Sequence, residues 1–185
     1  WTGINTAEIL GYHLNAYPNE KVQEIIKEYS IFKQLSAKGK KVTFVNAFSR
    51  KYDELIAAGK IKNSASTACA LAGGVRLRRR EELLKGKAVY QDITNEIFRQ
   101  RGEDVPIYKP FQAGQNLAQI SLEHDFSLFE YFQTDIRGHK RNLQEAVRSI
   151  EILDEFLGGY LAVEESVNPL EDKIILILTS DHGNI

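Results

Sequence analysis

The strongest constraint on the fold is an alternation of helical and strand patterns in the second half of the chain. Residues 109–125 and 142–162 carry apolar side chains at helical spacing. Residues 126–133 and 173–180 have the composition of strands. Helix, strand, helix, strand is the order typical of an open sheet with parallel neighbours. We therefore predict an α/β fold whose mostly parallel sheet is flanked by helices.

The first part of the chain predicts a similar unit. Residues 20–38 have the three-and-four apolar spacing of one amphipathic helix, which Gly39 would end. The β-branched and aromatic residues 41–48 follow as a strand. A short helix over 52–58 and a helix of small residues opened by Ser64 come next.

Three segments follow from these patterns. Residues 1–60 are the first part of the α/β core, and residues 111–185 are the second part. Residues 61–110 are the least periodic and are rich in Arg and Lys, which predicts a small cap or insertion. We expect this cap to lie over the carboxyl edge of the sheet and to select the substrate.

Proline and glycine give local signals in the two helical patterns 109–125 and 142–162. Pro110 falls in the first turn, where its missing N–H does no harm. In the following helical pattern, Gly158 and Gly159 predict that the helix ends near them.

Composition excludes several partners. Lys and Arg number 24 against 25 Asp and Glu, so the net charge of −1 provides no field for nucleic acid or an anionic membrane surface. No apolar run approaches the ~18 residues that a membrane span needs. The single cysteine, Cys69, cannot form an internal disulfide. These features predict a soluble protein of a reducing compartment, the cytoplasm.

Both late strands run into an Asp/His pair. Asp135 and His139 follow the first strand, and Asp181 and His182 follow the second. Ligands bind outside the carboxyl ends of parallel strands in open α/β sheets. If a helical turn begins there, the spacing of four places Asp135 and His139 on one face, as a chelating pair requires. We therefore expect the two pairs to converge.

The alternative reading of these residues is structural. An isolated Asp after a strand usually caps the next helix. Two Asp/His pairs at two strand ends form a coincidence that capping does not explain, so we favour the metal-binding interpretation.

The two motifs, TDIRGH at 134–139 and TSDHGN at 179–184, resemble the C-terminal metal motifs of the alkaline phosphatase superfamily. They are most similar to the branch of the cofactor-independent phosphoglycerate mutases. The opening WTGINTAEILGYHLNAYPN resembles the segment that follows the nucleophile in that branch and in related phosphodiesterases.

The resemblance implies a two-metal site. Asp135 and His139 would bind one divalent ion, and Asp181 and His182 the second. Carboxylate oxygen and imidazole nitrogen together suit zinc or manganese more than calcium. Family members add an N-terminal Asp, a Ser or Thr nucleophile and a later His, which we expect before Trp1 and beyond Ile185. On this reading the chain is a fragment that binds metal weakly and is itself inactive.

The substrate ligands are weaker predictions. Asn15 matches the position of a phosphate-orienting amide in related phosphodiesterases. Arg76 and Arg79, in the basic run 76–80, could bind a substrate phosphate through forked hydrogen bonds. The alternative for these arginines is a solvated helix start.

These readings predict a metal-dependent phosphomutase, phosphatase or phosphodiesterase that acts on a small phosphorylated substrate. A nucleotide-cofactor domain is the second hypothesis, but no G-x-G-x-x-G follows a strand. The third hypothesis is a noncatalytic interaction or regulatory domain that retains the fold. The intact Asp/His set disfavours it.

Overall fold

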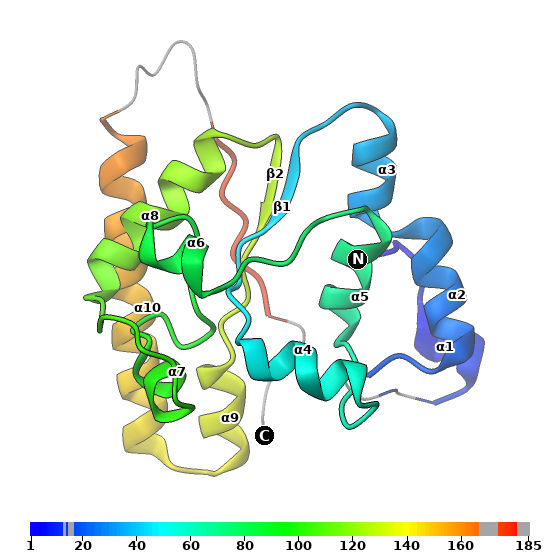
Figure 1. Ribbon diagram of the computed structural model, residues 1–185, viewed down its shortest axis with the longest axis horizontal. Coiled ribbons are helices and arrows are strands. Elements are labelled where there is room, and N and C mark those ends of the chain that lie inside the picture. The colour runs from blue at the N-terminus through cyan, green and yellow to red at the C-terminus, as the bar shows by residue number, and fades with distance from the viewer. Residues whose placement is uncertain (13, 15–16, 167–173, 181–185) are drawn as a thin grey trace.

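The computed structural model describes residues 1–12, 14, 17–166 and 174–180 (Figure 1). Its elements, in chain order, are α1 (Thr6–Leu10), α2 (Glu20–Tyr29), α3 (Ile31–Ala37), β1 (Val42–Phe44), α4 (Arg50–Ala57), α5 (Ala65–Ala72), α6 (Arg80–Leu84), α7 (Glu96–Gln100), α8 (Pro110–Leu122), β2 (Phe126–Leu128), α9 (Gln133–His139) and α10 (Leu143–Glu164). None of the helices in the described part of the chain is long and apolar enough to cross a membrane.

Strands β1 and β2 pair in parallel, with Val42 opposite Phe126 and Phe44 opposite Leu128. Beyond β1, isolated parallel bridges join Asn46 to Val89 and Ala47 to Arg78. Within the described residues the sheet therefore consists of two strands that are extended by single bridges. The α/β class and the parallel pairing expected from the sequence are confirmed.

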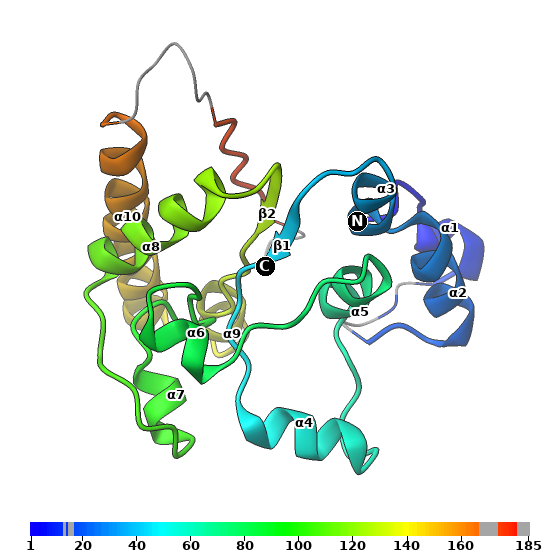
Figure 2. The ribbon, with the colours of Figure 1, turned by 45° about the horizontal axis from the view of Figure 1, so that its top comes forward.

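Helices cover both sides of this small sheet. Helices α8 and α10 lie on one side of β1 and β2, and α2, α3 and α5 lie on the other, as both views show (Figures 1 and 2). The alternation of side chains along a strand explains the two cores. Phe44 belongs to the cluster with α2, α3 and α5, whereas Val45 belongs to the cluster with α8 and α10.

The predicted single helix over residues 20–38 is wrong, because Ser30 interrupts it. Ser30 has an extended ψ of 130° and separates α2 from α3. Its buried hydroxyl donates to the carbonyl of Cys69 in α5, at 2.7 Å. This bond satisfies the hydroxyl away from water and places Phe32 in the core, where it has no exposed surface.

The expected end of the long helix near Gly158 and Gly159 is also wrong, since α10 continues to Glu164. A Cβ atom at Gly159 would overlap the carbonyl oxygen of Phe111 in α8. A Cβ atom at Gly114 of α8 would likewise overlap the carbonyl oxygen of Phe156 in α10. These glycines therefore allow the two helix backbones to cross closely, and do not mark an end.

The boundaries 1–60, 61–110 and 111–185 stay predictions. The structure shows that residues 61–110 share both cores with their neighbours. Helix α5 packs against α2 and α3, and Val89 hydrogen-bonds with Val45 through its backbone. The intervening helices α6 and α7 pack around a third cluster that includes Leu83 and Phe98.

The predicted strand over residues 173–180 is not formed in the described part, 174–180, which has no regular secondary structure. This segment runs beside β2 in both views (Figures 1 and 2). Ile174 packs against the α8–α10 core, but Ile175 and Ile177 are 85% and 78% exposed. An apolar, β-branched run becomes a strand only where its backbone groups pair with a neighbour, and composition alone does not supply that pairing.

Candidate metal centre

The candidate site is built where β2 leads into α9. The chain leaves β2 at Leu128 and enters α9 at Gln133, so the helix begins at the carboxyl end of the strand. This is the side of a parallel sheet on which ligands bind. The helical turn that the sequence interpretation requires is present, but the predicted strand over 126–133 is wrong in its length, because β2 ends at Leu128 and Gln133 already belongs to α9.

Asp135 and His139 lie one turn apart on α9. The Nε2 atom of His139 is 3.2 Å from Oδ1 of Asp135. The side chain of Asp135 is 49% exposed and that of His139 is 66% exposed. The spacing of four therefore brings a carboxylate and an imidazole together on one face.

A buried amide pair fixes the start of α9. Gln133 is only 5% exposed, and its Nε2 donates to Oε1 of Gln91 at 2.8 Å. The backbone N–H of Phe132 donates to the carbonyl of Gln91 at 3.3 Å. Oε1 of Gln133 is buried without a hydrogen-bond partner among the described residues. Gln91 thus anchors the helix that carries Asp135.

Helix α10 holds α9 from a second direction. The hydroxyl of Tyr131 donates to the carbonyl of Ser149 at 3.1 Å, just before α9 begins. Arg137 pairs with Glu145 at 3.5 Å across the two helices. Together with the Gln91 contacts, these bonds restrict the orientation of the helix face that bears the Asp/His pair.

Polar groups also join the carboxyl ends of β1 and β2. Asn46, which is buried, hydrogen-bonds with the backbone of Glu130. The hydroxyl of Ser66 in α5 donates to Oε2 of Glu130 at 2.7 Å. The strand exit is therefore tied to β1 and to α5 before the chain turns into α9.

Asp92, which directly follows Gln91 in the chain, is a buried carboxylate. It accepts hydrogen bonds from the backbone N–H of Asn95 at 2.9 Å and of Ile97 at 2.6 Å. Burial nevertheless raises the pKa of Asp92, because desolvation outweighs these bonds. Asp92 thus holds the turn into α7, at the cost of a carboxylate removed from water.

Three of the predicted site residues, Asp181, His182 and Asn15, lie outside the described residues. Their convergence with Asp135 and His139 stays a prediction. In the part of the chain that the structure describes, no group of three or more His, Cys, Asp and Glu is placed to hold a metal ion. The described half of the candidate site is therefore the pair on α9.

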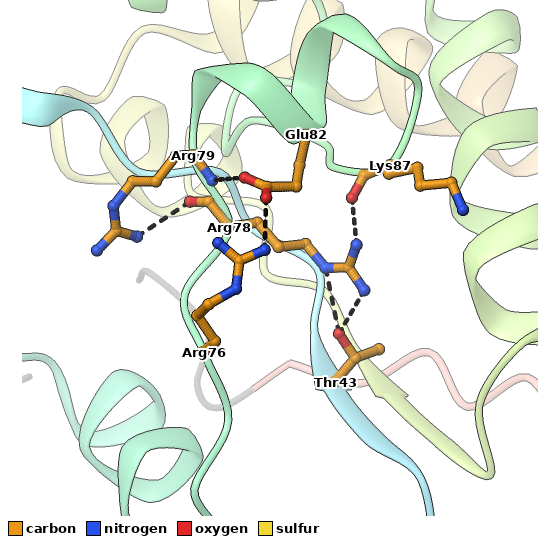
Figure 3. Close-up of polar contacts among 6 residues, drawn as sticks. All are labelled: Thr43, Arg76, Arg78, Arg79, Glu82 and Lys87. Carbon is orange, nitrogen blue, oxygen red and sulfur yellow. Dashed lines mark hydrogen bonds and ion pairs between the residues drawn. The ribbon is translucent and has the colours of Figure 1, made fainter.

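The side chains of Arg76 and Arg79 pair with different carboxylates, and Figure 3 shows the contact of Arg76 with Glu82. Arg76 pairs with the carboxylate of Glu82. Arg79 binds Asp53 through two parallel hydrogen bonds of 2.8 and 2.7 Å, and its guanidinium lies 5.8 Å above the ring of Phe48. Both arginines contribute to local structure here, and their roles as substrate ligands stay predictions.

Sequence reasoning missed Gln91 and Gln133. Gln133 was interpreted as the last residue of a strand, although it directly precedes the TDIRGH motif. Its partner lies 42 residues away in the chain, in the region with the weakest periodicity. Local pattern carries no information on such a distant pair, so only the fold could reveal it.

Comparison with known proteins finds a similarity in the C-terminal part of the chain. Residues 112–185, which contain both Asp/His motifs, match the metalloenzyme superfamily. The resemblance found in the sequence is therefore confirmed, and it is carried by the C-terminal part of the chain.

The curated proteins that match the chain carry the name of one enzyme. The chain is 32% identical over 68 residues to the 2,3-bisphosphoglycerate-independent phosphoglycerate mutase of Helicobacter acinonychis, a match that covers 37% of the chain and 13% of the relative. It is 36% identical over 62 residues to the same enzyme of Antithamnion sp., covering 33% of the chain and 11% of the relative. The match thus spans only a small part of these relatives. No solved structure gives a significant match.

The residues on α9 fit a divalent ion. Asp135 offers a hard anionic oxygen and His139 a neutral nitrogen, both accessible and on one helix face. This mixed donor set suits zinc or manganese. A typical catalytic zinc has three protein ligands, so two side chains such as these would provide only part of such a site.

Proposed function

We propose that the protein of which these residues form a part is a metal-dependent phosphoryl-transfer enzyme. The observation that carries the proposal is the Asp135–His139 pair on α9, at the carboxyl end of β2 and within the region that matches the metalloenzyme superfamily. The names of the relatives support phosphorylated small molecules as the substrate class.

The proposal assigns two divalent ions, zinc or manganese, to the site. Such ions, when bound, lower the pKa of an attacking oxygen and neutralise charge on the transferred group. Asp135 and His139 would hold one ion, and Asp181 and His182 the other. The contribution of α9 would be to present Asp135 and His139 in a fixed orientation, which the contacts of Gln133 and Tyr131 support.

The resemblance also implies a Ser or Thr nucleophile upstream of Trp1, which would accept the phosphoryl group covalently. Transfer from this group to water gives a phosphatase or phosphodiesterase, and transfer back to substrate gives a mutase. The similarity to phosphoglycerate mutases favours the mutase. Asn15, Arg76 and Arg79 are proposed as ligands of the substrate phosphate.

The alternative proposal is a noncatalytic α/β domain that retains the fold. The ion pairs that engage Arg76 and Arg79 are compatible with this alternative. The Asp/His pair argues against it, because a protein without metal chemistry has no reason to present both groups together on an accessible helix face.

The test compares the whole protein with variants in which one ligand is changed. Isomerisation of phosphoglycerate and hydrolysis of an aryl phosphate and of a phosphodiester are measured with added manganese or zinc. We expect Asp135→Asn and His139→Gln to lower the rate by at least ~10-fold. Asp154→Asn, an exposed carboxylate on α10, is the matched control and should retain the wild-type rate.

The same assays on residues 1–185 alone should show no turnover, since the proposed nucleophile lies outside them. Equal rates for residues 1–185 and the whole protein would place the chemistry in other residues. A whole protein that carries all the motifs but lacks every one of these activities would favour the noncatalytic alternative.

A further inference from the structure

A second polar site lies at the other end of the strands. A pocket of about 350 Å³ is lined by residues before and within β1, by the residues that follow α5, and by His124 before β2. Val42, the first residue of β1, is part of its wall. The pocket therefore opens at the amino-terminal ends of β1 and β2, whereas Asp135 follows the carboxyl end of β2.

Arg78 is the central feature of this pocket (Figure 3). Its Nε and Nη2 atoms donate to Oγ1 of Thr43 at 3.2 and 2.7 Å, and Nη1 donates to the carbonyl of Lys87. These acceptors are neutral. Among the described residues, no carboxylate forms an ion pair with Arg78.

The half-buried position of Arg78 makes the lack of a counter-ion significant. Burial lowers the pKa of its guanidinium, because desolvation disfavours the charged form. An arginine nevertheless stays protonated in proteins. Of its five N–H groups, three are used in the bonds to Thr43 and Lys87. Glu82 and Glu123 favour its charged form from a distance, but among the described residues neither carboxylate forms an ion pair with it.

The other lining residues reinforce the positive charge. Lys40 and Arg76 line the pocket, and within the described part of the chain no Asp or Glu is among the lining residues. Asp125 and Glu82, which pair with these two cations, approach from outside the lining. Lys40, Arg76 and Arg78 thus line one open volume, and the first two also pair with carboxylates outside the lining.

His124 also lines the pocket. Its Nδ1 lies 2.7 Å from the carbonyl of Ile120, so Nδ1 carries the proton in that bond. In the neutral tautomer Nε2 is an acceptor, so an anion in the pocket would be held by the cations and not by His124. The hydroxyl of Thr43 and the carbonyl of Lys87, which accept from Arg78, are neutral and do not compensate its charge. An anion bound in the pocket would compensate it.

We propose that this pocket is a binding site for the phosphate group of a small molecule. The guanidinium of Arg78 presents forked donors that match the oxygens of a phosphate. Lys40 and Arg76 contribute point charge around it. The pocket lies at the opposite ends of the strands from Asp135 and His139, and it shares Arg76 with the ligands proposed above for the substrate phosphate.

The test follows binding by NMR on the isotope-labelled chain in the presence of a metal chelator. Inorganic phosphate and glycerol 3-phosphate are titrated separately at constant ionic strength. We expect saturable shifts of the amides of Lys40, Gly74 and Arg76 and of the residues around them. The tighter of the two probes identifies whether a free phosphate or an ester is the preferred source.

Variants identify the residues responsible. Arg78→Lys keeps a charge but loses the fork, and should weaken binding by at least ~10-fold. Because Arg78 also ties Thr43 to Lys87, Arg76→Gln and Lys40→Gln provide tests at exposed positions, each with an expected loss of about threefold. Arg50→Gln is the matched control, since it removes an exposed cation with an ion pair outside the pocket.

The proposal is overturned if neither probe produces saturable shifts at the lining residues. It is also overturned if Arg76→Gln and Lys40→Gln bind phosphate as the wild type and Arg50→Gln do. Asp135→Asn should retain full binding. Loss of phosphate binding in Asp135→Asn alone would assign the anion to the candidate metal centre and not to this pocket.

Discussion

Asn46 and Glu130 join the carboxyl ends of β1 and β2 through two reciprocal hydrogen bonds. Nδ2 of Asn46 donates to the carbonyl of Glu130 at 2.8 Å, and the N–H of Glu130 donates to Oδ1 of Asn46 at 2.9 Å. One side chain thus continues the parallel ladder for one further step. It does so where the chain turns toward the helix that carries Asp135.

The Asn46–Glu130 pair predicts a large loss of stability in Asn46→Ala. Both backbone groups of Glu130 lose their partner next to a buried position, and each orphaned group costs about 1–3 kcal/mol. We expect the free energy of unfolding in urea to fall by ~2–4 kcal/mol in total. Asn142→Ala, which removes only an exposed helix cap, should cost about 1 kcal/mol or less. A loss in Asn46→Ala no larger than in Asn142→Ala would contradict this role.

The crossing of α8 and α10 predicts opposite effects at two adjacent glycines. Gly159→Ala places a methyl group on the Phe111 carbonyl oxygen, and should destabilise the protein by at least ~1–3 kcal/mol. At Gly158 the nearest atom to an added Cβ is Cδ2 of Phe111 at 4.0 Å, so Gly158→Ala has room. It should stabilise α10 by about 0.5–1 kcal/mol.

Thermal and urea unfolding of the two glycine variants provide the measurement. The identical chemical change at neighbouring positions separates helix propensity from the backbone approach. If Gly159→Ala were as stable as Gly158→Ala, the close contact between α8 and α10 would not exist.

Asp92 predicts a specific dependence of stability on pH. Its pKa is raised in the folded protein by burial, so between the ordinary value near 3.8 and the raised value the folded state binds more protons than the unfolded state. The contribution of Asp92 to stability therefore falls as pH rises through this window. Asp92→Asn does not titrate and removes this dependence.

The comparison is made by urea unfolding of both proteins from pH 4 upward. The free energy of unfolding of the wild type minus that of Asp92→Asn should decline with rising pH. An unfavourable contact between the new amide and the N–H of Ile97 shifts this difference by a constant and leaves its slope unchanged. A difference that increases with pH would show that the hydrogen bonds outweigh desolvation.

Local signals in the sequence predicted much of the architecture. Ser64 caps α5 by accepting from the N–H of Thr67, and Pro110 opens α8, as expected. The spacing of Asp135 and His139 predicted their shared helix face, because that arrangement depends only on the turn of one helix.

The secondary-structure predictions that were wrong depend on contacts with residues far away in the chain. The break at Ser30 depends on a carbonyl of α5, and the continuation of α10 past Gly159 depends on the backbone of α8. The run 173–180 was predicted as a strand on composition, but its described part, 174–180, has no regular secondary structure, because strand formation depends on a partner. None of these determinants is visible in the local pattern.

The most direct test of the candidate metal centre is the binding of Mn²⁺ to residues 1–185, followed by the loss of the paramagnetic resonance signal of the free ion. The wild type should bind Mn²⁺ weakly, since α9 supplies only two ligands. Asp135→Asn and His139→Gln should each lower the affinity by at least ~10-fold, while Asp154→Asn retains it. Unchanged Mn²⁺ affinity in both Asp135→Asn and His139→Gln would contradict the assignment of this pair as metal ligands.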